Sequence, residues 1–363
     1  MFERKSKLSD GPVLLDRVVK SGSQRVAILG LHPHAGTRTV LASLVRELHR
    51  RAWPFAVTSA PRLLLEEDAD AEPVTRIAIP EGAYIATSTG AAAQGDAGLE
   101  LQVATEWDAP MGKAAIYKVV RGGQADLQGP AEGEGMEEVV HRMGELSGGT
   151  VFVDGGWERR AFAAPGTSDG IVLVVAAGYS ATPERSAAAT RYLVETLTVP
   201  PCGEPARVAW EETARKGAAA LLDGGGHAVG VLPPGLEDPV PALRASAGAP
   251  VSTVVLPFGL NDEFMIPLVR SSFRCTLVVR DATRINVSPI YFKAWLKRRG
   301  RVQVVRPARL VAVASNPVNP AGPDADPLEF RQILAAALPD LPVHDVVVES
   351  GEESRKAVWK FWE

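Results

Sequence analysis

Hydrophobic and polar positions alternate in short blocks along the chain, and the first blocks predict a strand, a loop and a helix. Residues 25–29 (Arg-Val-Ala-Ile-Leu) form an apolar run of the length of a buried strand. Aliphatic residues then recur at helical spacing from Val40 to Leu48, which predicts an amphipathic helix over 39–51. Another strand is expected at 55–58. A strand–helix–strand order indicates a parallel sheet with a right-handed crossover.

Residues 60–130 show a different pattern. Short runs of alternating polarity lie at 75–79, 83–87, 99–105 and 113–120, and glycine-rich turns separate them. No helical period is evident between these runs. We therefore expect a largely antiparallel β insertion in an α/β scaffold.

The alternation of helices and strands returns after residue 130. A helix is predicted at 136–147, strands at 150–154 and 171–177, and a helix at 183–197. The stretch Pro-Pro-Cys-Gly-Glu-Pro at 200–205 is typical of a domain boundary. Beyond it we predict strands near 206–210, 228–232, 251–256, 274–280, 309–314 and 343–348, and helices around 211–221, 260–271, 290–298 and 328–337.

Together these patterns predict an α/β protein with a mostly parallel sheet. Its first strand–helix–strand unit is P-loop-like, an antiparallel β insertion follows, and a C-terminal α/β part completes it. The expected organisation is an N-terminal extension at 1–22, a P-loop-like α/β domain at 23–200 with the insertion at about 60–130, a second α/β domain at 201–350 and an aromatic C-terminal tail at 351–363.

Composition narrows the classes of function. Lys and Arg number 39 against 43 Asp and Glu, a net charge of −4, whereas a nucleic-acid binder generally carries a basic excess. Two cysteines, Cys202 and Cys275, cannot build a disulfide framework and suit a reducing compartment. The longest apolar run, 171–177, is far shorter than the ~20 residues of a membrane span. We expect a cytoplasmic protein that binds neither nucleic acid nor membrane.

The segment between the first strand and the first helix carries the clearest chemical signal. It runs from Gly30 to Thr39 as Gly-Leu-His-Pro-His-Ala-Gly-Thr-Arg-Thr. A loop that enters a helix N-terminus can bind phosphate through its amide groups, and the P-loop pattern G-x-x-x-x-G-K-[ST] adds a lysine and a magnesium-binding hydroxyl. No lysine is present here. Arg38 takes the lysine position if Thr39 is the hydroxyl, whereas Thr37 takes it if Gly36 is the second glycine. The alternative is an ordinary strand-to-helix turn with Thr37 or Thr39 as N-cap.

A second signal is the strand 150–154, which ends in Asp154 and is followed by Gly155 and Gly156. P-loop enzymes use an acidic residue at such a strand end to hold magnesium beside the phosphate loop. An ordinary turn after a strand is the competing interpretation. Beside the loop at 30–39, Asp154 favours a nucleotide site with Mg²⁺ held by Thr39 and Asp154.

Other polar residues are weaker candidates. His32 and His34 are interpreted as solvated or phosphate-facing, because further metal ligands are lacking nearby. Arg159 could stabilise phosphate charge, although surface ion pairing is the simpler interpretation. Asn316 and Asn319 follow a predicted strand, so we consider them for base or partner contacts, with turn formation as the alternative.

The order of these stretches resembles one family over about residues 25–348. The residues that carry the likeness are 30–39, 80–87, 109–112, 116–122, 153–155, 159–160, Ala163, 167–172, 253–257, Asp281 and 306–322. The chain resembles the P-loop-like component of the lysine 5,6-aminomutase reactivase, which works beside a MutS-related ATPase.

The resemblance implies a nucleotide-binding, chaperone-like subunit that restores an inactivated adenosylcobalamin-dependent aminomutase by cofactor exchange. It implies ATP or GTP with Mg²⁺ at Gly30, Gly36, Thr37, Arg38, Thr39 and Asp154, and no tightly bound cobalamin. Its partners would be the MutS-related ATPase and the B12-dependent aminomutase. Weak ATP or GTP hydrolysis within a complex stays open, since the loop lacks lysine. A non-hydrolysing scaffold for the ATPase, with a degenerate P-loop, is the alternative function.

Overall fold

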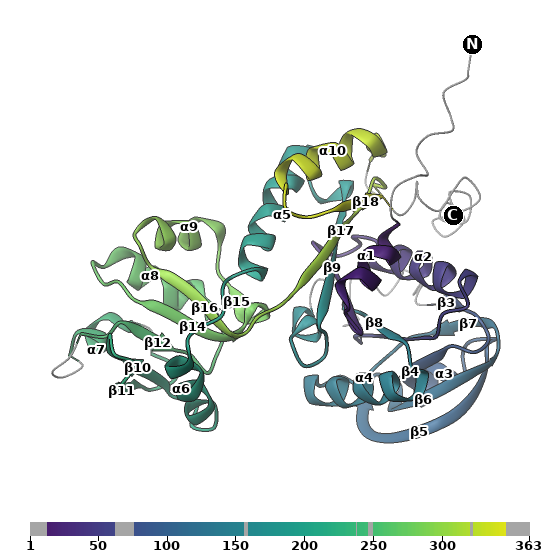
Figure 1. The fold of residues 1–363 in the computed structure, drawn as a ribbon, viewed down its shortest axis with the longest axis horizontal. Coiled ribbons are helices and arrows are strands. Elements are labelled where there is room, and N and C mark those ends of the chain that lie inside the picture. The colour runs from purple at the N-terminus through teal and green to yellow at the C-terminus, as the bar shows by residue number, and fades with distance from the viewer. Residues whose placement is uncertain are drawn as a thin grey trace, which may run out of the picture. The chain divides into compact units, whose positions relative to one another are not determined.

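The computed structural model comprises two compact units (Figure 1). The first unit comprises Met1–Arg191 and Leu310–Glu363, and the second comprises Tyr192–Arg309. The residues described are 13–61, 76–155, 159–236, 238–245, 250–319 and 322–345.

A nine-stranded mixed sheet forms the centre of the first unit. The strand order is β18-β17-β9-β1-β8-β2-β4-β6-β5, parallel from β18 to β4 and antiparallel from β4 to β5. The predicted α/β class with a mostly parallel sheet is therefore confirmed. The strands are β1 (Arg25–Gly30), β2 (Phe55–Ser59), β4 (Tyr84–Ser88), β5 (Gly98–Ala109), β6 (Gly112–Arg121), β8 (Thr150–Asp154), β9 (Gly170–Ala176), β17 (Leu310–Asn316) and β18 (Val343–Asp345).

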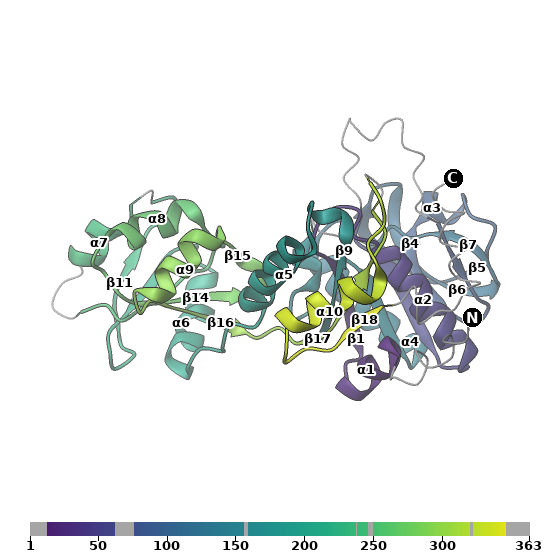
Figure 2. The same ribbon diagram turned by 90° about the horizontal axis from the view of Figure 1, so that it is seen from above.

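Helices cover both faces of this sheet, and the alternation of side chains along β8 shows which helix lies on which face. Phe152 packs in the same cluster as α2 (Thr37–Arg50), whereas its neighbours Val151 and Val153 pack with α4 (Gly133–Ser147). In Figures 1 and 2, α10 (Pro327–Ala337) lies along β17 and β18.

The N-terminal part differs from the predicted extension at 1–22. Within the described residues, α1 (Leu14–Ser21) belongs to the body of the first unit, because Leu14, Leu15 and Val18 are buried in the same core as α2. The predicted C-terminal tail at 351–363 lies outside the described residues.

The insertion is mainly antiparallel, as predicted, but it extends the central sheet. Its strand β4 pairs in parallel with β2 and antiparallel with β6, so β4 connects the parallel part of the sheet to the antiparallel part. A separate two-stranded pair, β3 (Arg76–Ile79) with β7 (Gly123–Asp126), and the short helix α3 (Thr89–Ala92) complete it.

The second unit has its own five-stranded sheet, in the order β11-β10-β12-β14-β16. A two-stranded pair, β13 with β15, and several helices accompany it. Its elements are α6 (Glu204–Ala214), β10 (Ala219–Leu222), β11 (Ala228–Leu232), α7 (Val240–Ala245), β12 (Thr253–Val255), β13 (Leu260–Asn261), α8 (Asp262–Arg270), β14 (Thr276–Asp281), β15 (Ile285–Asn286), α9 (Pro289–Lys297) and β16 (Arg301–Arg306).

Three expectations for this region were wrong. The helix predicted at 211–221 ends at Ala214, and the strand β10 begins at Ala219. Residues 206–210 belong to α6 and not to a strand, because Ala206, Ala209 and Thr213 bury one helical face. The predicted second domain at 201–350 ends earlier, since β17 and β18 pair into the first sheet through β9. Helix α5 (Pro183–Leu197) contains the residue pair, 191 and 192, at which the first unit gives way to the second.

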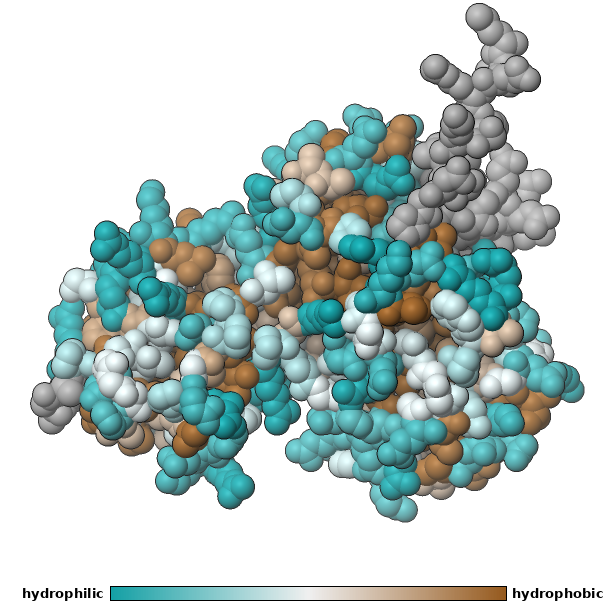
Figure 3. All heavy atoms as spheres, viewed as in Figure 1, coloured by the Kyte–Doolittle hydropathy of each residue, from teal (hydrophilic) through white to brown (hydrophobic). Residues whose placement is uncertain are grey.

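The surface mixes hydrophilic and hydrophobic residues, as Figure 3 shows for one face. Large hydrophobic side chains that are strongly exposed include Ile290 at 70% and Val231 at 67%. Scattered residues of this kind are ordinary on protein surfaces. Across the described part of the chain, no helix has both the length and the apolar character that a membrane crossing requires.

Candidate functional site

The carboxyl ends of β1 and β9 form a topological switch point. From β1 the chain proceeds to β2 on one side, and from β9 the next strand of this sheet is β17, on the other side. Loops that leave neighbouring strands in opposite directions open a crevice, and ligands of open α/β sheets bind there. Gly30 ends β1 opposite Val174 of β9, so the loop at 30–39 begins at this crevice.

Asp154 lies on the other side of β1. Strand β8 pairs in parallel with β1, and Asp154 is in register with Ile28. The structure thereby brings together two segments that the sequence suggested separately, the loop at 30–39 and the acidic end of β8.

Backbone contacts give the loop a defined path. The amide of Leu31 donates to the carbonyl of Val174 at 2.8 Å, and the amide of Ala35 donates to the carbonyl of His32 at 3.3 Å. His34 and Gly36 both have positive φ, at +59° and +90°. The chain thus turns twice through the left-handed region before α2 begins.

Gly36 is required by space as well as by conformation. A Cβ atom there would lie 2.3 Å from Nδ2 of Asn316, at the end of β17. Asn316 is buried and donates from Nδ2 to the carbonyl of Ala35 at 3.1 Å. Asn316 therefore supports the loop. Its Oδ1 also accepts a hydrogen bond from the amide of Val318 at 3.2 Å, which bears out the turn-forming interpretation.

Helix α2 presents its first amide groups at the end of this loop. Gly36 is the N-cap and makes no side-chain cap hydrogen bond, and the first helical hydrogen bond runs from the amide of Val40 to the carbonyl of Gly36 at 3.1 Å. The expectation that Thr37 or Thr39 would act as N-cap is wrong. The amides of residues 37–39 have no acceptor within the helix, and the helix dipole makes this end attractive to anions.

Arg38 and Asp154 form an ion pair beside these amides. Nε of Arg38 lies 3.5 Å from Oδ2 of Asp154, and the two side chains are 16% and 7% exposed. Gly36 directly precedes the helix, as the second glycine of a P-loop does. This favours the alignment with Thr37 in the lysine position and Arg38 in the position of the magnesium-binding hydroxyl.

The predicted magnesium ion does not fit this arrangement. Magnesium needs oxygen ligands in octahedral geometry, and Asp154 would have to supply one of them. The guanidinium of Arg38 instead faces that carboxylate, and a divalent cation bound there would be repelled by it. Oδ1 of Asp154 is buried and accepts no hydrogen bond from the part of the chain that the structure describes. Within that part, no group of three or more His, Cys, Asp and Glu side chains is arranged around a metal position.

The ring of His32, in this loop, contacts the ring of Tyr179. Its ring centroid lies 5.4 Å from that of Tyr179, in the short 3-10 turn Ala177–Tyr179 after β9. Burial lowers the pKa of His32 below its usual value, a backbone hydrogen bond at Pro33 opposes this, and the charge of His34 lowers the pKa further. Sequence reasoning missed Tyr179. Its one signal was its place just after a buried strand.

Other sequence candidates serve local structure. Nη1 of Arg159 donates to the carbonyl of Ala131 at 3.5 Å, and its guanidinium lies over the ring of Phe162. The amide of Asn319 donates to Asp324 at 2.9 Å in a turn, which bears out the turn-forming interpretation. Asp281 belongs to the second unit, where its carboxylate accepts a hydrogen bond from the amide of Thr283.

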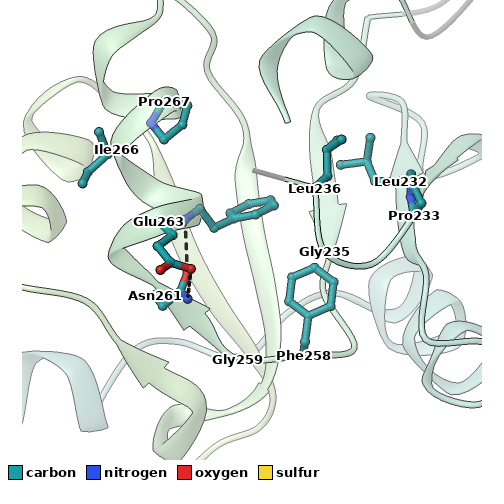
Figure 4. A pocket seen from close by; sticks show the side chains of 11 residues that line it. Leu232, Pro233, Gly235, Leu236, Phe258, Gly259, Asn261, Glu263, Ile266 and Pro267 are labelled. Atoms are coloured by element: carbon teal, nitrogen blue, oxygen red, sulfur yellow. Dashed lines mark hydrogen bonds between the residues drawn. The ribbon is translucent and has the colours of Figure 1, made fainter. Parts of the chain in front are cut away.

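A hollow of about 510 Å³ lies in the second unit (Figure 4). The rings of Phe258 and Phe264 meet edge to face, with centroids 6.0 Å apart. Glu263 is the charged residue of its lining and accepts a hydrogen bond from Asn261 at 3.4 Å. No residue predicted for the site lies there. The lining residues are Leu232, Pro233, Gly235, Leu236, Phe258, Gly259, Asn261, Glu263, Phe264, Ile266 and Pro267.

Comparisons with known proteins give no match, whether with family models, with curated proteins or with solved structures. The resemblance to the reactivase component therefore stays a prediction from the sequence.

Proposed function

We propose that the chain binds the phosphate groups of ATP or GTP at the loop of residues 30–39. One observation carries this proposal: the uncapped N-terminus of α2 follows a glycine-containing loop at the switch point of the sheet. Three amides at residues 37–39 and the cationic Arg38 then offer donors and positive charge at one place. Gly36 supplies the positive φ before α2, and Gly30 leaves room for the carbonyl of His32, which would lie 3.1 Å from a Cβ there.

The proposed biological role follows from the resemblance. A nucleotide bound at this loop would switch a reactivase subunit between states, in a complex with a MutS-related ATPase and a B12-dependent aminomutase. Terminal phosphate contacts order loops in many nucleotide switches, and residues 30–39 are in a position to respond in this way. Cobalamin would belong to the client enzyme and not to this chain.

The residues support binding more than hydrolysis. The loop has no lysine to reach the terminal phosphates, and Arg38 engages Asp154 through Nε. The same ion pair supports a second candidate, a scaffold that holds the ATPase partner without nucleotide. In that case the pair would be a permanent structural contact.

Calorimetric titration with ATP and GTP separates the two candidates. We expect the wild-type chain to bind and Arg38→Ala to weaken binding at least tenfold. Arg50→Ala is the matched control, because Arg50 lies on the same helix with its side chain 69% exposed. Absence of binding, repeated with the MutS-related partner present, would leave the scaffold. Equal weakening by both substitutions would place the nucleotide elsewhere.

A further inference from the structure

Arg38 stands where a phosphate loop would hold the ligand of a magnesium ion. Two glycines and a buried strand lead into α2, and the residue that follows the lysine position is Arg38 instead of serine or threonine. Its guanidinium faces Asp154, the acidic residue that would otherwise complete the magnesium shell. Arginine at this position therefore provides no hydroxyl for a magnesium ion, and it also pairs with the carboxylate of Asp154.

The burial of Asp154 makes this more than a surface contact. The carboxylate side chain is 7% exposed, and its Oδ1 has no hydrogen-bond partner among the described residues. Burying a charged group is costly unless an opposite charge lies beside it. At this site the positive charge comes from the chain itself, through Nε at 3.5 Å.

We propose that Arg38 replaces the divalent cation, so that this loop binds nucleotide phosphates without magnesium. The inference rests on the proposed function, since it concerns the same loop. Asp154 acts as a positioning residue that keeps the guanidinium beside the amides of residues 37–39. Guanidinium is always charged and its planar group matches phosphate oxygens, so it supplies the countercharge that metal-dependent sites take from the ion.

The proposal has a specific consequence for the nucleotide. A magnesium–nucleotide complex carries its own divalent cation, and the guanidinium of Arg38 would repel that cation at this site. We therefore expect free ATP to bind at least as tightly as its magnesium complex. A site that depends on magnesium would show the opposite order.

The test is a calorimetric titration of ATP into the full chain, once with EDTA and once with excess MgCl2. For the wild type we expect the dissociation constant in EDTA to equal or fall below that in MgCl2. For Arg38→Thr, which restores a hydroxyl beside Asp154, we expect at least tenfold weaker binding in EDTA and recovery in MgCl2. Adding Asp154→Asn to Arg38→Thr should abolish that recovery.

The outcomes separate this inference from the proposed function. Wild-type binding that is at least tenfold tighter in MgCl2 than in EDTA would overturn the inference and leave the phosphate site in place. An absence of ATP binding in both buffers would overturn both. If Arg38→Thr does not fold, as judged by its thermal unfolding, the two wild-type titrations still decide.

Discussion

Asn316 and Ala35 are separated by 281 positions along the chain, yet the side-chain amide of Asn316 donates to the carbonyl of Ala35 at 3.1 Å. The contact joins the end of β17 to the turn that precedes α2. Nδ2 of Asn316 also occupies the space that a Cβ at Gly36 would need. The last strands of the first unit therefore shape the proposed phosphate loop.

This contact predicts a coupled effect of two substitutions. Gly36→Ala should destabilise the chain, because alanine at φ +90° is strained by on the order of 2 kcal/mol and its Cβ would also meet Asn316. Asn316→Ala should cost about 1 kcal/mol for each of the two hydrogen bonds that it removes, with Ala35 and with Val318. Because Asn316→Ala also removes the clash, the double variant should be more stable than the sum of the two effects predicts.

Urea unfolding of the four proteins measures this coupling. The free energies of unfolding should show a favourable interaction between the two substitutions. Strictly additive losses would mean that Asn316 does not limit the space at residue 36.

The pair of Arg38 and Asp154 predicts a second stability effect. Arg38→Ala leaves a buried carboxylate without its cation, and the expected loss is on the order of 3 kcal/mol. Arg50→Ala on the same helix removes an exposed ion pair with Glu47 and should change stability much less, because solvent screens such pairs. Thermal unfolding compares the two variants. Similar small losses of stability for both variants would show that a group other than Arg38 stabilises the charge of Asp154.

His32 predicts a pH dependence of stability. Burial lowers the pKa of His32 in the folded chain below the ordinary value of 6.5. The unfolded chain therefore binds more protons in the window between the two pKa values, so stability should fall as pH drops through about 6.5 toward the folded pKa. Removing His32 should reduce this loss.

The pair His32→Asn and His34→Asn tests this point, because both residues lie in the same loop and asparagine tolerates the positive φ of His34. Unfolding should be followed between pH 5 and pH 8, a range chosen around the usual histidine value. His32→Asn should flatten the acid side of the stability curve more than His34→Asn. An unchanged curve for His32→Asn would contradict the burial of this ring.

The two cysteines should differ in reactivity. Burial raises the pKa of Cys275 to about 12, and it raises the pKa of the half-buried Cys202 as well. Thiolates are the reactive species, so iodoacetamide should modify Cys202 slowly and leave Cys275 intact in the folded protein. Mass spectrometry of labelled peptides reads this out, with urea-unfolded protein as the control. Equal labelling of both cysteines before unfolding would contradict the burial of Cys275 in the second unit.

Much of the first unit was predictable from local patterns. The helix over 39–51, the strand at 25–29 and the strand at 150–154 follow from period and burial, and the structure confirms them as α2, β1 and β8. The acidic strand end at Asp154 and the loop at 30–39 were also evident. The sequence indicated only that both would lie at the same edge of the sheet. The ion pair between Arg38 and Asp154 depends also on the register of β8 against β1, which local patterns do not show.

Non-local pairing explains most of what the sequence could not show. Nothing in residues 309–314 indicates that β17, which follows the second unit in the sequence, pairs with β9 of the first unit. The limit predicted for the second domain, residue 350, was therefore misplaced. Residues 206–210 are a mostly apolar run of strand length, but the buried face of α6 repeats at Ala206, Ala209 and Thr213. Strand β16 was missed although Val302 and Val304 alternate with Gln303, because the run is short and arginines stand at both of its ends.

The central claim is that nucleotide phosphates contact the amides at the start of α2. An NMR titration of ¹⁵N-labelled protein with ATP tests it directly, because each backbone amide reports its own environment. The account predicts the largest shift changes at the amides of residues 36–39 and at the Arg38 side chain, and their loss in Arg38→Ala. Shifts confined to other segments, or none at saturating ATP, would contradict it.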